Sequence, residues 1–129
     1  MPAVDTNVVV RFVARDDPAQ YARAAALFRR QPVWIAKTVL LETEWVLRSI
    51  YAYEPQQIAS ALRRLAGLPN VQIEDPAAAA RALDWYQQDL DFADALHLAS
   101  KAKAGNFLSF DGKLVKRAQR AGATWVALL

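Results

Sequence analysis

Four acidic residues occupy positions where carboxylates could act together on a substrate: Asp5, Glu42, Asp94 and Asp111. Asp5 comes directly after the short apolar run Ala3-Val4, and Asp111 closely follows the run 106–109. If both runs are strands of an open α/β sheet, the two carboxylates lie at the strand ends where such sheets place their ligand sites. Each of the two, taken alone, can equally be a turn former or a helix cap.

Glu42 is predicted to lie on a helix that starts at Thr38. Because each helical residue advances by about 100°, Glu42 falls at the edge of the apolar face of this helix. That face is expected to comprise Val39, Thr43, Val46 and Ile50. A carboxylate on an apolar edge is costly unless something outside the helix compensates its charge. Either a metal ion or an arginine from another helix would do so.

Two other helical acids show contrasting patterns. Glu44 is expected on the opposite side of its helix, where it pairs with Arg48 four residues later in an ordinary solvent-exposed arrangement. Asp94 falls in the first turn of a later helix, where a negative charge interacts favourably with the helix dipole. It also lies beside a predicted apolar stripe formed by Ala95, Leu98, Ala99 and Ala102. The dipole accounts for the first-turn position but not for the apolar neighbours.

Clustered carboxylates are the donors that metal-dependent phosphodiester hydrolysis requires. Divalent metal ions make water nucleophilic at neutral pH and compensate the charge at the phosphate. Without a cation, four crowded carboxylates would repel one another and raise each other's pKa. The sequence has no cysteine and one histidine, His97, so thiolate zinc sites and paired catalytic histidines are excluded. Oxygen ligands suit magnesium or manganese.

The elements that would position these acids alternate along the chain. Strands are expected at 3–4, 33–36, 71–73, 106–109 and 125–127. Asp17-Pro18, Glu54-Pro55 and Asp75-Pro76 are typical helix starts, with an acidic cap before proline. Thr38 is expected to cap the helix that runs to about Tyr53, and Asp91 the helix that runs to about Lys103 before Gly105. This alternation predicts an α/β fold with a mostly parallel central sheet and helices on both faces.

Length and composition are those of a globular protein. The chain has 129 residues, of which 54% are hydrophobic, and these values predict one domain spanning 1–129. No apolar run approaches the roughly 20 residues of a membrane helix. The first residues lack the charged and apolar regions of a signal peptide, so a cytoplasmic location is expected. The net charge of +3 is a weak bias towards a polyanionic or acidic partner.

Four sequence blocks resemble the PIN-domain family, in the family's order and with its usual spacing. The opening Ala3-Val4-Asp5-Thr6-Asn7 resembles the strand that delivers the first catalytic Asp. The segment 41–48, Leu-Glu-Thr-Glu-Trp-Val-Leu-Arg, resembles the helix with the catalytic Glu and is close to the form seen in VapC toxins. The segment 91–99 resembles the block with the third acid, and 107–111 the strand and turn with the fourth. Ser109 stands where the family usually has Thr, which preserves a hydroxyl.

The resemblance implies a three-layer PIN-like fold and a small ribonuclease that uses magnesium, with manganese able to substitute. Asp5, Glu42, Asp94 and Asp111 are then the catalytic and metal-binding residues. Proteins of the VapC type usually form homodimers, and a cognate VapB-like antitoxin holds them inactive. Toxin and antitoxin together typically bind operator DNA, with the antitoxin making the DNA contact.

Other polar residues are candidates for supporting roles. Thr6, Asn7 and Ser109 could orient carboxylates or waters around a metal. Lys113, Lys116 and Arg117 flank Asp111 and could contact RNA phosphates, although a solvated helix face is an equal alternative. Asp91 is a second acid near Asp94, but Asp94 is favoured because Ala-Leu follows it in the family's manner. His97 could approach the site from one turn beyond Asp94, and a surface or packing role is the simpler interpretation.

Competing classes fit the sequence less well. A phospho-receiver domain needs adjacent acids after its first strand, whereas this chain has Asp5 followed by Thr6 and Asn7. A haloacid-dehalogenase-like phosphatase needs an Asp at position 7, which is Asn here. A PIN fold that has lost its chemistry and serves only for interaction is the remaining alternative. The four acids argue against it.

Overall fold

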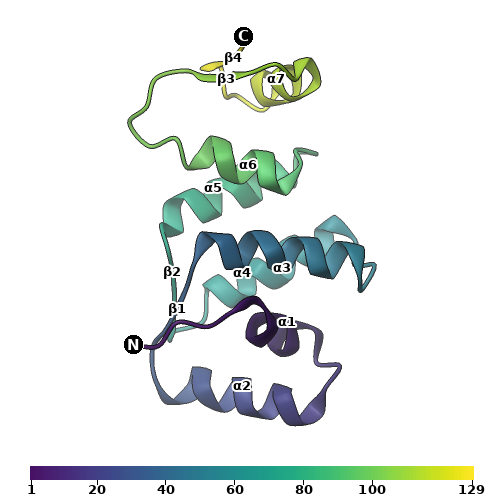
Figure 1. Cartoon of the computed structure of the whole chain (residues 1–129), viewed down its shortest axis with the longest axis vertical. Helices are drawn as coiled ribbons and strands as arrows, with labels where there is room; N and C mark the ends of the chain where they lie inside the picture. Colours follow the sequence, from purple (N-terminus) through teal and green to yellow (C-terminus); the bar gives the residue numbers. More distant parts are fainter. The chain divides into compact units, whose positions relative to one another are not determined.

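The computed structural model describes residues 1–129 and contains seven helices and four short strands (Figure 1). The helices are α1 (Thr6–Ala14), α2 (Pro18–Arg30), α3 (Lys37–Ser49), α4 (Pro55–Ala66), α5 (Pro76–Tyr86), α6 (Phe92–Ala99) and α7 (Gly112–Arg120). The strands are β1 (Val33–Ile35), β2 (Val71–Ile73), β3 (Phe107–Ser109) and β4 (Val126–Leu128). The α/β class predicted from the sequence is confirmed.

The chain divides into two compact units, an N-terminal unit of Met1–Pro76 and a C-terminal unit of Ala77–Leu129. In the N-terminal unit β1 and β2 pair in parallel, with Val33 opposite Val71 and Ile35 opposite Ile73. The first residues add a parallel bridge to the same sheet between Ala3 and Trp34. Helix α1 packs against α2 and α3, and α4 contacts α3 and β2. Asp5 therefore follows a segment that runs parallel to β1.

The C-terminal unit has its own pair of parallel strands. Phe107 of β3 lies opposite Val126 of β4, and Ser109 lies opposite Leu128. Helix α7 packs on both strands (Figure 1). The predicted parallel pairing is thus confirmed within each unit, as two two-stranded sheets. The organisation of 1–129 as one domain stays a prediction.

Most of the expected helix starts are present. Asp17 caps α2 with its side chain and Pro18 occupies the first turn. Glu54 and Gln57 form a reciprocal capping box at the start of α4. The prediction for Thr38 is wrong, because α3 begins at Lys37 and its N-cap is Ala36, which has no side-chain acceptor. The Glu74 side chain provides the missing acceptor, taking a hydrogen bond from the Lys37 backbone N–H at 2.9 Å.

Two helices end earlier than predicted. Helix α3 ends at Ser49, four residues before Tyr53, and α6 ends at Ala99, four residues before Lys103. The residues after Ala99 form turns in which Ala102 has a φ of 53°, a left-handed conformation that an α-helix cannot continue through. The structure contains no helix that combines the length and the apolar character needed to cross a bilayer.

The inward face of α3 differs from the predicted one. Its buried residues are Leu40, Thr43, Glu44 and Leu47, whereas Ile50 is 66% exposed and Glu42 is exposed. The predicted pair between Glu44 and Arg48 is present, with Arg48 Nε 2.7 Å from Glu44 Oε2. The prediction that this arrangement is solvent-exposed is wrong, because Glu44 is only 2% exposed. Glu44, not Glu42, is therefore the acid within the packed face of the helix.

Candidate functional site

Asp5 lies at the point where the first extended segment turns into α1. Its carboxylate caps that helix, since Oδ1 accepts a hydrogen bond from the Val8 N–H at 3.1 Å. The cap uses one oxygen, so Oδ2 is left to bind a ligand in the solvent-exposed position of this side chain. Thr6 and Asn7, the proposed supporting residues, form the first turn of α1.

Glu42 lies in the second turn of α3, on a side of the helix that faces solvent. The alternative of a salt bridge to an arginine on another helix is not realised. Its carboxylate is available to a ligand, although its position does not have the apolar setting expected from the sequence.

Glu74 and Asp75 are two acids at the carboxyl end of β2 that were not among the predicted site residues. Glu74 accepts the Lys37 backbone N–H, and Asp75 Oδ2 lies 3.6 Å from Lys37 Nζ. Both carboxylates thus contribute to holding the start of α3 beside the sheet. Their place directly after an apolar strand is the sequence signal that could have identified them, and it is the same signal that identified Asp5.

Asp94 is half-buried in the first turn of α6, beside the buried Ala95 and Leu98. Burial raises the pKa of its carboxyl above the ordinary value, and the negative charges of Asp91 and Asp111 raise it further. The exposed His97 on the same helix has a smaller, opposite effect. Asp91 caps α6 through Oδ2, which accepts the Asp94 N–H at 3.1 Å. The structure therefore brings Asp91, Asp94 and Asp111 into one electrostatic environment.

Asp111 lies between β3 and α7 and is held from both sides. Its backbone N–H donates to Ser109 Oγ at 3.0 Å. Its Oδ1 accepts hydrogen bonds from the N–H groups of Lys113 and Leu114, which caps α7. As with Asp5, one carboxylate oxygen is used and Oδ2 points to no protein donor. Ser109 thus fixes the backbone that carries the acid.

These acids fit a divalent cation in chemistry, although three or more of them do not gather into one ready-made metal group. Glu42 and Asp94 accept no protein hydrogen bond, while Asp5 and Asp111 each keep one free oxygen. Charge repulsion from Asp91 and Asp111 on a half-buried Asp94 is the situation that a bound cation relieves. Carboxylate oxygens are the donors that magnesium and manganese prefer.

The raised pKa of Asp94 predicts a pH dependence of stability. The folded protein binds the Asp94 proton more tightly than the unfolded chain does. This tighter binding contributes fully to the free energy of unfolding below the ordinary Asp pKa of about 3.9. The contribution is lost as the pH rises through the raised pKa of the folded protein. In EDTA, Asp94→Asn should therefore have a higher Tm than the wild type at pH 7 and an equal Tm near pH 3. Thermal melts across this range provide the measurement. A lower Tm for Asp94→Asn at pH 7 would contradict the repulsion.

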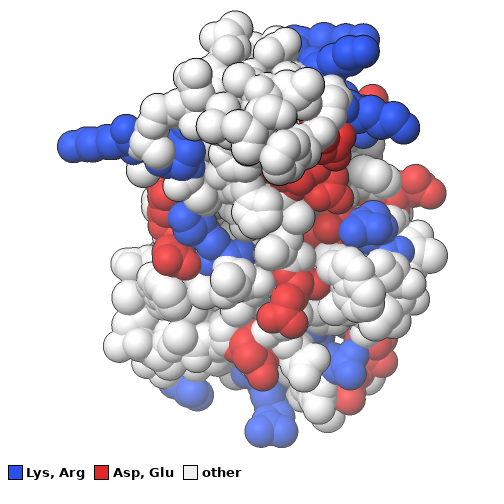
Figure 2. Space-filling view, turned by 45° about the horizontal axis from the view of Figure 1, so that its top comes forward, with Lys and Arg blue, Asp and Glu red and all other residues white.

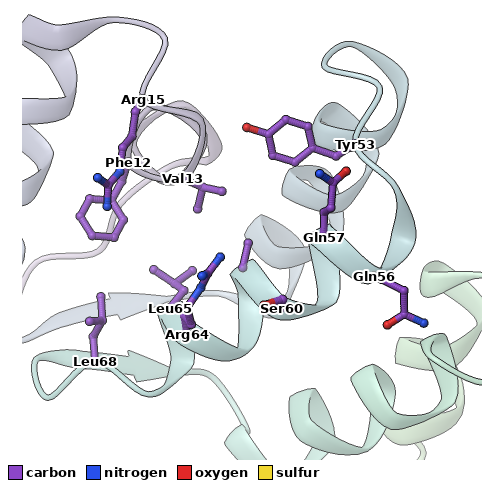
Figure 3. Close-up of a pocket in the computed structure, with 11 residues that line it drawn as sticks. Phe12, Val13, Arg15, Tyr53, Gln56, Gln57, Ser60, Arg64, Leu65 and Leu68 are labelled. Carbon is purple, nitrogen blue, oxygen red and sulfur yellow. The ribbon is translucent and has the colours of Figure 1, made fainter.

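The N-terminal unit contains a large pocket that is not a carboxylate site. It encloses about 790 Å³ between α1 and α4, with Phe12 and Arg15 on one side and Ser60, Arg64 and Leu65 on the other (Figure 3). No carboxylate lines it. Size alone therefore does not identify the site of chemistry here, and the acids remain the better guide.

Cations and acids are mixed on the surface. Figure 2 shows Lys and Arg side chains extending outward, with Asp and Glu side chains gathered between them on the face in view. Lys113, Lys116 and Arg117, the cations predicted near Asp111, are all exposed on α7.

The fold and the acids define an α/β protein with carboxylates after its parallel strands. Comparison with known families finds the PIN domain over residues 3–120, and the chain belongs to that family. This match spans all four predicted acids. PIN domains are generally nucleases, typically use divalent metals and often pair with antitoxins. Searches of curated proteins and of solved structures returned no match.

Proposed function

We propose that this protein is a metal-dependent endoribonuclease and the toxin of a type II toxin–antitoxin pair of the VapC kind. The observation that carries the proposal is the PIN-domain match over 3–120, which covers most of both compact units and includes all four acids. The family supplies the nuclease class, and the resemblance of 41–48 to VapC toxins supplies the narrower assignment. The same match supports one PIN domain over the whole chain.

Asp5, Glu42, Asp94 and Asp111 are proposed to hold magnesium, with manganese as a substitute. Such an ion, when bound, activates a water molecule and compensates the charge that develops on the phosphate. The chain's own residues prepare the carboxylates. Val8 N–H orients Asp5, and the N–H groups of Lys113 and Leu114 orient Asp111. Ser109 fixes the turn before Asp111, which gives its hydroxyl a positioning role.

The proposed partners follow from the same assignment. RNA is the substrate, and Lys113, Lys116 and Arg117 are proposed to contact its phosphates. A VapB-like antitoxin is the inhibitor, the toxin forms a homodimer, and operator DNA is bound only through the antitoxin. A cytoplasmic location is proposed, because a type II toxin acts on RNA inside the cell.

The nuclease proposal is tested with purified protein and a panel of structured and unstructured RNAs. We expect cleavage with magnesium or manganese and none in EDTA. A metal-induced rise in Tm should accompany it, because a ligand that binds only the folded state stabilises that state. Absence of both cleavage and the Tm rise would reject the nuclease and favour a PIN-fold interaction module. A Tm rise without cleavage would retain the metal site and indicate an RNA target outside the panel.

A further inference from the structure

A groove of about 450 Å³ runs between α1 and α2 in the N-terminal unit, and Asp5 is one of its lining residues. Arg11 of α1 lines it, and so do Arg23 and Arg30 of α2. Three guanidinium groups and one of the proposed metal-binding carboxylates thus share a single depression. The groove is separate from the larger pocket between α1 and α4, which contains no acid.

The three arginines differ in what they already bind. Arg11 is held by the protein: its Nε donates to Gln20 Oε1 at 2.8 Å, and its Nη1 lies 3.1 Å from Asp16 Oδ2. Tyr51 completes this cluster by donating its hydroxyl to Asp16 at 2.7 Å. Arg23 and Arg30 are exposed and take part in no ion pair or hydrogen bond with the protein. Two of the three guanidinium groups are therefore free to bind an anion from solution.

The spacing of the two free arginines suits a chain of anions. They are seven residues apart on α2, which corresponds to two turns on one face and about 10.5 Å along the axis. Leu27, between them in sequence, lines the same groove and offers an apolar surface between the two cations. This arrangement presents two separate anion contacts in a row, as a phosphate backbone does.

We propose that Arg23 and Arg30 bind successive phosphate regions of a single-stranded RNA and guide that strand to Asp5. This inference rests on the proposed nuclease function. An arginine fork binds phosphate in a bidentate manner, which fixes the strand as well as attracting it. The two cations also offset the repulsion that the acids would exert on an incoming phosphate chain. Arg30 lies in the last turn of α2, where a cation interacts favourably with the helix dipole. Arg29 in the same turn makes that interaction equally well, so the dipole does not account for an arginine that lines the groove.

The test compares two double variants with the same loss of charge. Arg23→Gln/Arg30→Gln removes the free cations of the groove. Arg29→Gln/Arg64→Gln is the matched control, because both residues are exposed in the N-terminal unit and line other pockets. The affinity of the full chain for a fluorescent single-stranded RNA is measured by anisotropy in EDTA over a range of salt concentrations. Thermal melts confirm that each variant is folded.

We expect the groove variant to bind the RNA about tenfold more weakly than the control, and its slope of log affinity against log salt to be smaller by about 1.4, the contribution of two phosphates on a single strand. Equal weakening in both double variants, or none, would overturn the proposal. The proposal would also be overturned if the groove variant lost affinity for an acidic peptide while its affinity for RNA was unchanged. That result would assign the groove to a protein partner.

Cleavage assays separate the two proposals. If the wild type cleaves RNA with metal and the groove variant cleaves and binds equally well, the groove is rejected and the nuclease stands. If the wild type shows neither cleavage nor a metal-induced rise in Tm, but the groove variant alone loses RNA affinity, the nuclease is rejected and the RNA-binding groove stands.

Discussion

Asp5→Asn should abolish metal-dependent RNA cleavage while leaving the fold intact. The substitution removes the negative charge that would bind a divalent ion, but Asn is as good a helix N-cap as Asp. Its side-chain oxygen can accept the Val8 N–H that Asp5 accepts at 3.1 Å. We expect the cleavage rate to fall by more than about 100-fold. Mutation of residues that only hydrogen-bond to metal ligands already lowers metal affinity or activity by up to about that factor. Initial rates with saturating magnesium measure the loss.

Asp5→Ala is the control that separates charge from capping. It removes the charge and the cap, so it should lose activity as Asp5→Asn does and in addition lose about 1 kcal/mol of the free energy of unfolding. Chemical denaturation of the three proteins tests the second expectation. Cleavage retained by Asp5→Asn in a nuclease-free preparation would show that Asp5 does not bind a metal ion that the reaction needs.

Local signals in the sequence predicted most of the elements. Three of the parallel strands, β1, β2 and β3, each lie within an expected apolar run, and β4 is displaced by one residue. Acid–proline pairs marked the starts of α2, α4 and α5, because proline is preorganised for the first helical turn. The start of α3 was missed because its acceptor, Glu74, is 37 residues away in sequence. A hydrogen-bond acceptor supplied by a distant part of the chain leaves no signal in the sequence near the start of the helix.

The orientation of α3 could not be derived from its sequence. Its apolar residues are spread around the helix, so the stripe through Val39 and Val46 and the stripe through Leu40 and Leu47 have the same helical spacing. Thr43 belongs to both stripes, and hydrophobicity favoured the first because the second contains the charged Glu44. The structure buries the second, with the Thr43 hydroxyl donating to the Val39 carbonyl oxygen at 2.7 Å and Glu44 paired with Arg48. Satisfied polar groups made burial of the more polar face possible.

The candidate site was predicted as a set of residues rather than as a geometry. Sequence position correctly placed Asp5 and Asp111 after extended segments and Asp94 beside apolar neighbours. Asp5 and Asp111 are also the N-caps of α1 and α7, which was the simpler interpretation of each residue. The two roles are compatible, because a cap uses one carboxylate oxygen and leaves the other. The free arginines of the α1–α2 groove were not predicted as a pair, since their common surface arises only when α1 packs on α2.

Glu44 provides the contrast between a structural acid and the proposed catalytic ones. It is 2% exposed and its partner Arg48 is on the same helix, with a side chain that is 44% exposed. A buried charge is tolerated only while its partner is present, and removing the partner of a buried pair typically costs 3–5 kcal/mol. Because the Arg48 side chain is 44% exposed, solvent partly screens the pair, and we expect a cost at the lower end of this range.

Arg48→Met should therefore lower the free energy of unfolding by about 3 kcal/mol at pH 7, because the buried Glu44 would lose its guanidinium partner. The double variant Glu44→Met/Arg48→Met should recover most of this loss, since it removes the buried charge as well and fills the space with apolar atoms. Urea denaturation of the wild type, both single variants and the double variant gives the interaction energy as a cycle. An Arg48→Met protein as stable as the wild type would show that Glu44 does not depend on Arg48.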